Sequence, residues 1–86
     1  MNVSHTINRD ILIEHVDDTT IIFFPESSTL FTLNRTSAYI LSSIQQEMEE
    51  HTIITRYAKI FSVSIQVAKK DVKNTISKLK KFKIIL

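Results

Sequence analysis

The stretch TLFTLNRTSA at positions 29–38 contains the point at which the spacing of the apolar residues changes. Before Asn34 the side chains alternate between two faces, and this alternation predicts a strand over Thr29–Leu33. Asn34 is a good helix N-cap, because its side-chain oxygen accepts a hydrogen bond from a backbone N–H of the first turn. The chain is therefore expected to change from strand to helix at this residue. The two faces of the strand carry Phe31 and Leu33, and Leu30 and Thr32.

Two further strands are expected before this stretch. Arg9–Val16 reads as a strand, and Thr19–Phe24 is β-branched and aromatic throughout. Asp17-Asp18 is expected to form the turn between them, since aspartate tolerates left-handed backbone conformations better than most residues. Pro25–Ser28 is the next turn. Three short strands in succession predict an antiparallel meander.

Three helices are expected after Asn34. The first runs to about Met48, and Glu49–His51 is a polar break. Thr52 is expected to cap a short second helix, and Ser64 a long third helix after the turn Ser62-Val63-Ser64. The apolar positions that define the three helices are Ala38, Leu41, Ile44 and Met48; Ile53, Ile54, Tyr57, Ala58 and Phe61; and Ile65, Ala68, Val72, Ile76 and Leu79.

The order β-β-β-α-α-α predicts an α+β fold, in which a three-stranded antiparallel meander is followed by three helices that form a layer against the small sheet. The chain ends in Ile84-Ile85-Leu86, an apolar segment that must pack somewhere. Eighty-six residues are expected to form one domain over 1–86, and the 43% hydrophobic content allows a core without disulfides.

The composition excludes several classes of site. Glycine is missing altogether, and dinucleotide fingerprints, phosphate loops and nucleophile elbows all require it. Cysteine is missing too, so thiolate metal sites are excluded. Met1–Asp10 has no apolar core of a signal peptide, and the longest apolar run is Ile21–Phe24. A cytoplasmic protein without a membrane span is expected.

Charge is distributed unevenly along the chain. Residues 1–58 carry three arginines against eight acids, a balance of −5, whereas residues 59–86 carry eight lysines against Asp71, a balance of +7. A basic final third beside an acidic remainder suggests an acidic partner, either a peptide or a nucleic acid. A solvated lysine face on an amphipathic helix explains the same pattern equally well.

No catalytic or metal-binding constellation is evident. His5, His15 and His51 are expected in a tail, a strand and a loop, without metal-ligand spacing between any two. The acid pairs Asp17-Asp18 and Glu49-Glu50 fall in expected turns, where solvated carboxylates are common. We therefore expect no enzyme activity, no catalytic residue, no metal and no cofactor.

The arrangement of these elements resembles the PqqD-like family, the recognition elements for ribosomally synthesised and post-translationally modified peptides (RiPPs). The resemblance is carried by the Leu33-Asn34-x-Thr36 junction, a helix starting at Thr52, Val63-Ser64, Asp71-Val72 seven residues later, and an apolar end. It covers about Arg9 to Leu86. The family commonly has glycine in the first hairpin, after the first helix and before the apolar end, where this chain has Asp17-Asp18, the Glu49-Glu50 region and Lys83. A large aromatic residue common in the first helix is also missing, with Leu41 the nearest substitute.

This resemblance implies a winged-helix-like domain whose strands come first, with a precursor leader peptide bound between the third strand and the third helix. The peptide would add to the sheet along Thr29, Leu30, Phe31, Thr32 and Leu33. The opposite wall of the binding groove would be one of two flanks of the third helix, either Lys69, Lys73 and Lys80, or Asp71 and Thr75. Val72 and Ile76 would form either an apolar floor or plain core.

The partners that the resemblance implies are a precursor leader and a modifying enzyme, such as a leader peptidase, a radical-SAM maturase or a cyclase. A lasso-peptide leader peptidase is the favoured enzyme. The alternative is a helix-turn-helix DNA-binding protein, formed by the second helix, Ser62-Val63-Ser64 and the lysine-rich third helix. Against it, the third helix begins Ile65-Gln66-Val67-Ala68, which offers only Gln66 to read bases, and nucleic acid is therefore not the expected partner.

Overall fold

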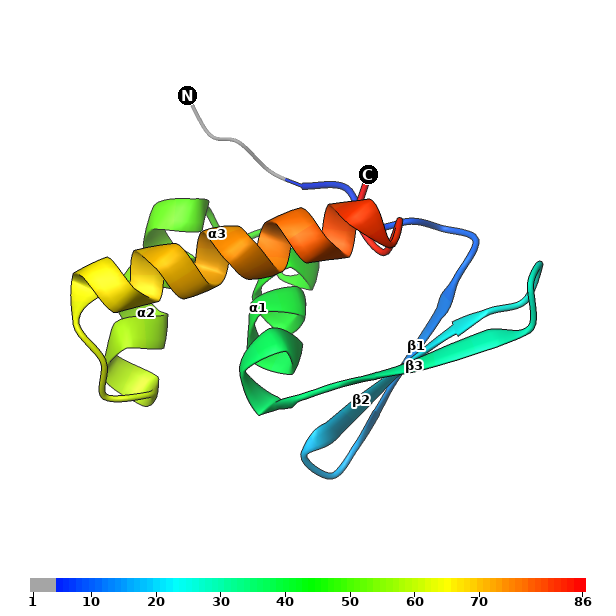
Figure 1. Ribbon diagram of the computed structural model, residues 1–86, viewed down its shortest axis with the longest axis horizontal. Coiled ribbons are helices and arrows are strands. Elements are labelled where there is room, and N and C mark those ends of the chain that lie inside the picture. The colour runs from blue at the N-terminus through cyan, green and yellow to red at the C-terminus, as the bar shows by residue number, and fades with distance from the viewer. Residues whose placement is uncertain (1–4) are drawn as a thin grey trace.

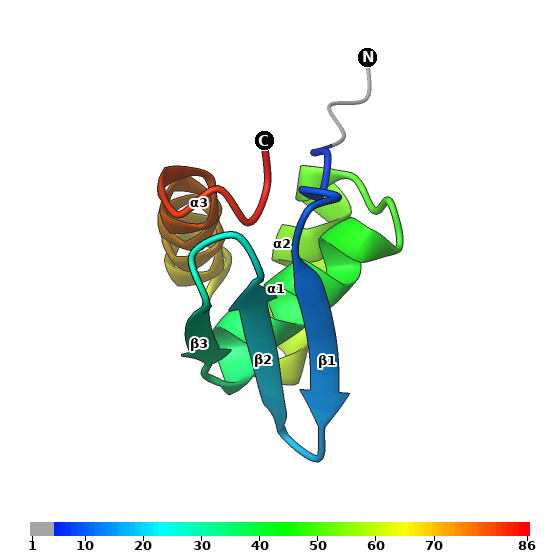
Figure 2. The same ribbon diagram turned by 90° about the vertical axis from the view of Figure 1, so that its right-hand side faces the viewer.

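The computed structural model describes residues 5–86 and has three strands followed by three helices (Figure 1). The sheet forms one layer and the helices lie on one of its faces (Figure 2). The expected α+β order is therefore confirmed. The elements are β1 Leu12–Val16, β2 Thr19–Phe24, β3 Thr29–Leu33, α1 Arg35–Gln45, α2 Glu50–Ile60 and α3 Ile65–Lys81.

The sheet is an antiparallel meander in the order β1-β2-β3, so β1 and β3 are both edge strands. Its first hairpin turns at Asp17-Asp18, and Asp17 has the expected left-handed backbone (φ 55°). β1 begins three residues later than expected, at Leu12 rather than Arg9. The reason is a local turn, in which the backbone N–H of Asp10 donates to Oδ1 of Asn8 at 2.9 Å.

The core lies between the sheet and the helices. Ile22, in the middle strand, is fully buried, as are Ile40 and Leu41 of α1 and Ile53 of α2. The apolar C-terminal segment packs as expected at Ile84 and Ile85, although Leu86 is 67% exposed. Ile85 also forms a β-bridge with Ile7, so the two ends of the described chain lie side by side.

Two expected helix starts are confirmed by their caps. The side chain of Asn34 accepts from the N–H of Ser37 at 2.9 Å, and that of Ser64 accepts from the N–H of Val67 at 3.1 Å. The expected start of α2 is wrong, because Glu49 rather than Thr52 is the N-cap, and His51 is helical rather than in a loop. Glu50 in the first turn explains the earlier start, since a carboxylate is favourable near the positive end of the helix dipole.

Each helix ends in a Schellman motif in which a residue other than glycine takes the left-handed conformation. After α1, Glu47 (φ 60°) is that residue, and the N–H of Met48 donates back to the carbonyl of Ser43. Met48 therefore lies beyond the helix, which ends at Gln45 and not at about Met48. The left-handed residue and following apolar residue are Ser62-Val63 after α2 and Lys83-Ile84 after α3.

These motifs explain how the turns form without glycine. Left-handed residues occur in the first hairpin, after the first helix and before the apolar end, as Asp17, Glu47 and Lys83. The position after the first helix is Glu47, two residues before the expected Glu49-Glu50 region. Among residues 5–86, no helix has the length and apolar character needed to cross a membrane.

Candidate functional site

The backbone of β3 faces outward at Leu30 and Thr32. The turn Asp17-Asp18 joins Val16 to Thr19, and such a turn bonds the carbonyl of its first residue to the N–H of its fourth. Hydrogen-bonded and non-bonded pairs alternate along an antiparallel ladder, so β2 uses its next bonding positions, Ile21 and Phe23, toward β1. Thr32 and Leu30, which lie opposite them on β3, therefore direct their N–H and C=O groups toward the open edge.

Helix α3 lies beside this edge without closing it. Within the described residues, no Cα atom of β3 comes within 8 Å of a Cα atom of α3. A further strand would lie about 4.8 Å from β3 in the hydrogen-bonding direction. The backbone of α3 is therefore too distant to take that position, and the edge of β3 faces a groove whose other wall is the helix.

A cavity of about 180 Å³ lies in this groove. It is enclosed by side chains of β3, the start of α1, α3 and the C-terminal segment. Its volume is below the roughly 300–1,000 Å³ of pockets that hold drug-sized ligands, so it is suited to a single side chain. The lining residues are Phe31, Thr32, Leu33, Ser37, Thr75, Lys78, Leu79, Phe82 and Ile84.

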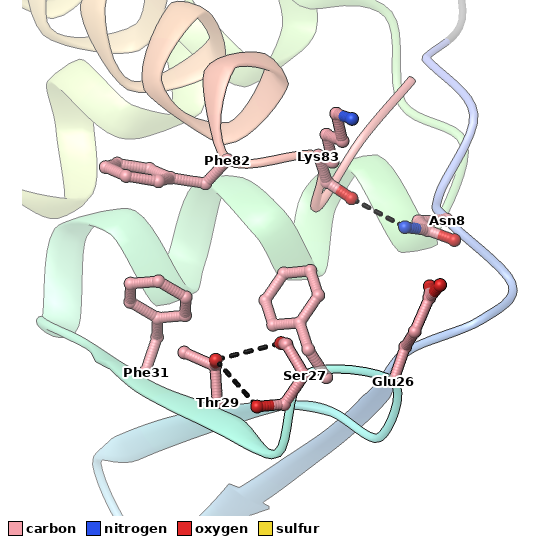
Figure 3. Close-up of a pocket in the computed structure, with 8 residues that line it drawn as sticks. Asn8, Glu26, Ser27, Thr29, Phe31, Phe82 and Lys83 are labelled. Atoms are coloured by element: carbon pink, nitrogen blue, oxygen red, sulfur yellow. Dashed lines mark hydrogen bonds between the residues drawn. The ribbon is translucent and has the colours of Figure 1, made fainter.

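A second cavity, of about 310 Å³, continues the groove at the other end of β3 (Figure 3). Three aromatic rings line it: Phe31 packs edge-on against Phe24 at 5.6 Å between centroids, and in a tilted arrangement against Phe82 at 5.4 Å. The side-chain amide of Asn8 donates to the carbonyl of Lys83 at 2.8 Å on the far side. The remaining lining residues are Glu26, Ser27 and Thr29.

The structure decides which flank of α3 forms the wall. Thr75 and Lys78 line the 180 Å³ cavity, and Phe82 continues the same flank by helical periodicity. The alternative flank lies on the other side of the buried stripe of α3. All three lysines of that flank are exposed, and none of them lines either groove cavity. These lysines are Lys69, Lys73 and Lys80.

Asp71 lies on the groove flank, but its carboxylate is already engaged. The hydroxyl of Tyr57 donates to Oδ2 of Asp71 at 3.0 Å, joining α2 to α3. Burial raises the pKa of Tyr57 above its ordinary value, and the hydrogen bond and negative charge of Asp71 act in the same direction. This contact fixes α2 against the wall of the groove.

The five residues of β3 divide as the sequence predicted. Thr29, Phe31 and Leu33 are half-buried toward the helices, and Leu30 and Thr32 are exposed. Val72 and Ile76 are only 0% and 5% exposed, so they are core residues that support α3 from within. Ile65, expected in the same stripe, is 52% exposed at the start of the helix.

Phe82 and Lys78 are among the groove residues that sequence reasoning did not select. Thr75, Lys78 and Phe82 follow one another at intervals of three and four, which places them on one helical flank. That spacing was available in the sequence, but nothing in it showed which flank faces β3. Phe82 is also half-exposed at the C-cap of α3.

Histidine and carboxylate side chains do not gather at the groove. In residues 5–86, no three His, Cys, Asp or Glu side chains lie close enough together to hold a metal ion. At the opposite end of α3, the exposed first-turn side chains include the apolar Ile65 and Val67. In this turn, Gln66 alone is of the types that read base edges, which are arginine, lysine, asparagine and glutamine.

The sequence matches one protein-family model. The model is described as Coenzyme PQQ synthesis protein D (PqqD), and it matches residues 19–85, from β2 to the C-terminal segment. No curated protein matches the sequence.

Two solved structures share the fold. One, described as lasso peptide synthetase B1 complexed with the leader peptide, superposes with a TM-score of 0.90 at 17% identity, over 98% of this chain and 99% of the other. The other, TbiB1 in complex with the TbiA(beta) leader peptide, has a TM-score of 0.85 at 18% identity, over 93% of each chain. The likeness extends over all six elements of the fold.

Proposed function

The chain belongs to the PqqD family, and from this premise we propose that it is a non-catalytic adaptor for a RiPP precursor. It binds the extended leader of the precursor peptide by strand addition to β3 and presents the peptide to the enzyme that modifies it. The action takes place in the cytoplasm, where the precursor is made.

One observation carries this proposal: β3 is an open edge with a groove beside it. The outward N–H and C=O groups of Leu30 and Thr32 can pair with the backbone of a guest strand. Backbone pairing provides affinity that does not depend on sequence, whereas cavities beside the strand select side chains. The edge of β3 provides the backbone pairing, and the groove provides the cavities that select side chains.

The groove suits a particular kind of peptide. The smaller cavity is lined largely by apolar groups of Phe31, Leu33 and Leu79, so an apolar side chain of the guest fits there. Lys78 at the same cavity favours an acidic residue close to that side chain. An extended peptide with an apolar residue and an acidic residue close to it therefore fits the cavity and pairs with Lys78.

The two solved structures of the same fold support the proposal, because each contains a leader peptide. One of them is described as lasso peptide synthetase B1, and the other as TbiB1. We therefore propose a lasso-peptide leader peptidase as the enzyme partner, in preference to a radical-SAM maturase or a cyclase.

The adaptor acts by raising the local concentration of the precursor at the enzyme. Tethering turns the encounter of precursor and enzyme into a nearly intramolecular step, at an effective concentration of the order of millimolar for a short flexible linker. A dissociation constant of about 1 μM, equivalent to about 8 kcal/mol, suffices for capture and permits release.

The test is binding of the synthetic leader encoded by the precursor gene beside the gene of this protein. We expect a dissociation constant of about 1 μM or tighter by calorimetry. A series of leaders N-methylated at one position each separates strand addition from other modes. Methylation at alternate positions should weaken binding several-fold, since each lost hydrogen bond is worth about 0.5–1.5 kcal/mol, and the intervening positions should tolerate it.

Two outcomes contradict the proposal. One is a methylation series without a period of two, which would rule out strand addition. The other is the absence of leader binding together with binding of duplex DNA that weakens steeply with salt, which would support the helix-turn-helix alternative.

A further inference from the structure

The face of the sheet that points away from the helices is apolar and uncovered. By the register, Leu12, Phe23 and Leu30 lie in one row across the three strands, Ile21 lies in the next row on the same face, and Val16 lies in the row beyond it. Leu12 is 61% exposed, Leu30 59% and Val16 48%. Figure 2 shows the helices behind the sheet, and no element of residues 5–86 covers this face. We call these five residues the outer face.

The surroundings of the outer face are acidic. Residues 10–33, which include all three strands, contain five carboxylates and neither lysine nor arginine. Glu14 projects from the outer face itself, opposite Ile21, and Asp17 and Asp18 form the tip of the first hairpin. The lysines of this chain are all in residues 59–83, on α2, α3 and the segment that follows.

This charge pattern argues against a second copy as the occupant. Two outer faces packed against each other would bring their carboxylates together, and like charges across an interface are unfavourable. A lysine-rich α3 from another copy would bring opposite charges together, but that contact joins different surfaces and does not close into a dimer. The pattern fits a different protein, with an apolar patch bordered by lysine and arginine.

We propose that the outer face docks the modifying enzyme, through such a patch, while the leader occupies the groove. This inference rests on the proposed function. A peptide added to β3 becomes the fourth strand, and alternate side chains of that strand point to the same side as Leu30 and Thr32. The enzyme therefore contacts the adaptor and the bound peptide on one continuous surface.

One consequence is coupling between the two ligands. Because the guest strand extends the outer face, the enzyme binds the leader-loaded adaptor more tightly than the empty adaptor. By thermodynamic linkage the enzyme strengthens leader binding by the same factor. The modifying enzyme would thus recruit loaded adaptors in preference to empty ones.

The experiment uses the full chain, the synthetic leader and the purified modifying enzyme encoded beside this protein's gene. The variant Leu12→Lys with Val16→Lys places two cations on β1, away from the groove. We expect at least tenfold weaker enzyme binding and a leader dissociation constant within twofold of wild type. Ile65→Lys is the matched control, because Ile65 is an equally apolar side chain that is 52% exposed on α3. It should change neither affinity.

Several outcomes overturn the inference. They are unchanged enzyme binding by the double variant, equal weakening by Ile65→Lys, no enzyme binding by the wild-type protein, or wild-type self-association by sedimentation that the double variant abolishes. If the lysine pair unfolds the protein, Leu12→Thr with Val16→Thr replaces it, because threonine is β-branched and favourable in strands. A wild-type protein that binds enzyme through Leu12 and Val16 but no leader would refute the proposed function and leave enzyme docking standing.

Discussion

The two edges of the sheet offer a guest strand the same backbone chemistry but different surroundings. The hydrogen-bonding pattern that directs the backbone groups of Leu30 and Thr32 to the open edge of β3 also directs those of Ile13 and His15 to the open edge of β1. Among residues 5–86 no further strand pairs with either edge, so both edges carry the outward N–H and C=O groups that strand addition requires. Backbone chemistry alone does not distinguish them.

Side chains and the position of α3 make the difference. Side chains of β3 and α3 line the smaller cavity, and side chains of β3 with Phe82 and Lys83, which follow α3, line the larger one. Neither cavity includes a residue of β1. On β1 the ring of His15 is occupied, by Thr20 at 2.8 Å and by Gln45 at 3.2 Å. The comparison teaches that an open strand becomes a specific site only when a second wall supplies pockets for the guest side chains.

The largest effect is expected from blocking the two edges in turn. Thr32→Pro removes an outward donor of β3 and places a ring where the guest strand would lie, so leader binding should weaken at least tenfold. His15→Pro removes an outward donor of β1, together with the bonds of its ring to Thr20 and Gln45, and should leave the leader dissociation constant within twofold. Calorimetry measures both, with thermal unfolding as the check on each fold. Equal losses for the two prolines would remove the distinction between the edges.

The side-chain wall is tested next. Phe82→Ala removes a half-exposed ring shared by both cavities, and we expect five- to tenfold weaker leader binding, about 1–1.4 kcal/mol. Ile60→Ala truncates a similarly exposed side chain on α2 and serves as the control. Leader titrations by fluorescence anisotropy give the two affinities. A Phe82 variant that binds like wild type would show that backbone pairing alone holds the peptide.

A smaller effect distinguishes the two flanks of α3. Lys78→Gln should weaken binding of an acidic leader two- to fourfold, as expected for an exposed ion pair of about 0.2–1 kcal/mol. The loss should shrink at high salt. Lys80→Gln makes the same change on the opposite flank and should have no effect beyond that of net charge. A greater loss for Lys80 would place the peptide on the wrong side of the helix.

The smallest effect concerns the contact that holds the wall in place. Tyr57 has a raised pKa, so above about pH 10 the unfolded chain loses this proton more readily than the folded chain. The stability that the Tyr57 hydroxyl contributes is fully present below pH 10 and is lost as the pH rises through the raised pKa of the folded protein. Raising the pH from 9 to 11 should therefore lower the melting temperature of wild type more than that of Tyr57→Phe. Asp71→Asn should leave the leader affinity at pH 7 within twofold of wild type. Equal pH slopes would contradict the raised pKa.

Much of the fold followed from local signals in the sequence. The alternation at Thr29–Leu33 and the caps Asn34 and Ser64 are short-range features, and the structure has them where the sequence placed them. The helix ends were less predictable, because Met48 continues the helical spacing although it follows a left-handed residue and packs back on the last turn. Without glycine, no residue type marked that reversal.

The candidate site was predictable only in part. The strand that forms the edge was evident, but the choice between the flanks of α3 depends on how the helix rotates against the sheet. Val72 and Ile76 illustrate the limit, since apolar residues on a helix suit a core and a binding floor equally well, and only their burial identifies them as core. The participation of Phe82 depends on the same rotation, because Phe82 continues the flank of Thr75 and Lys78.

The glycine-free corners have a consequence for engineering. A residue other than glycine in the left-handed conformation destabilises the folded state by roughly 1–2 kcal/mol. Glycine avoids this cost and lowers stability by only about 0.5–1 kcal/mol, because it makes the unfolded chain more flexible. Exchanging Glu47, Ser62 and Lys83 for glycine should therefore raise the melting temperature, by about 4–8 °C for each kcal/mol gained in a domain of this size. Glu47 and Ser62 line neither groove cavity, so the exchanges after α1 and α2 add stability without altering the surface on which a guest peptide would be redesigned, whereas Lys83 lines the larger cavity.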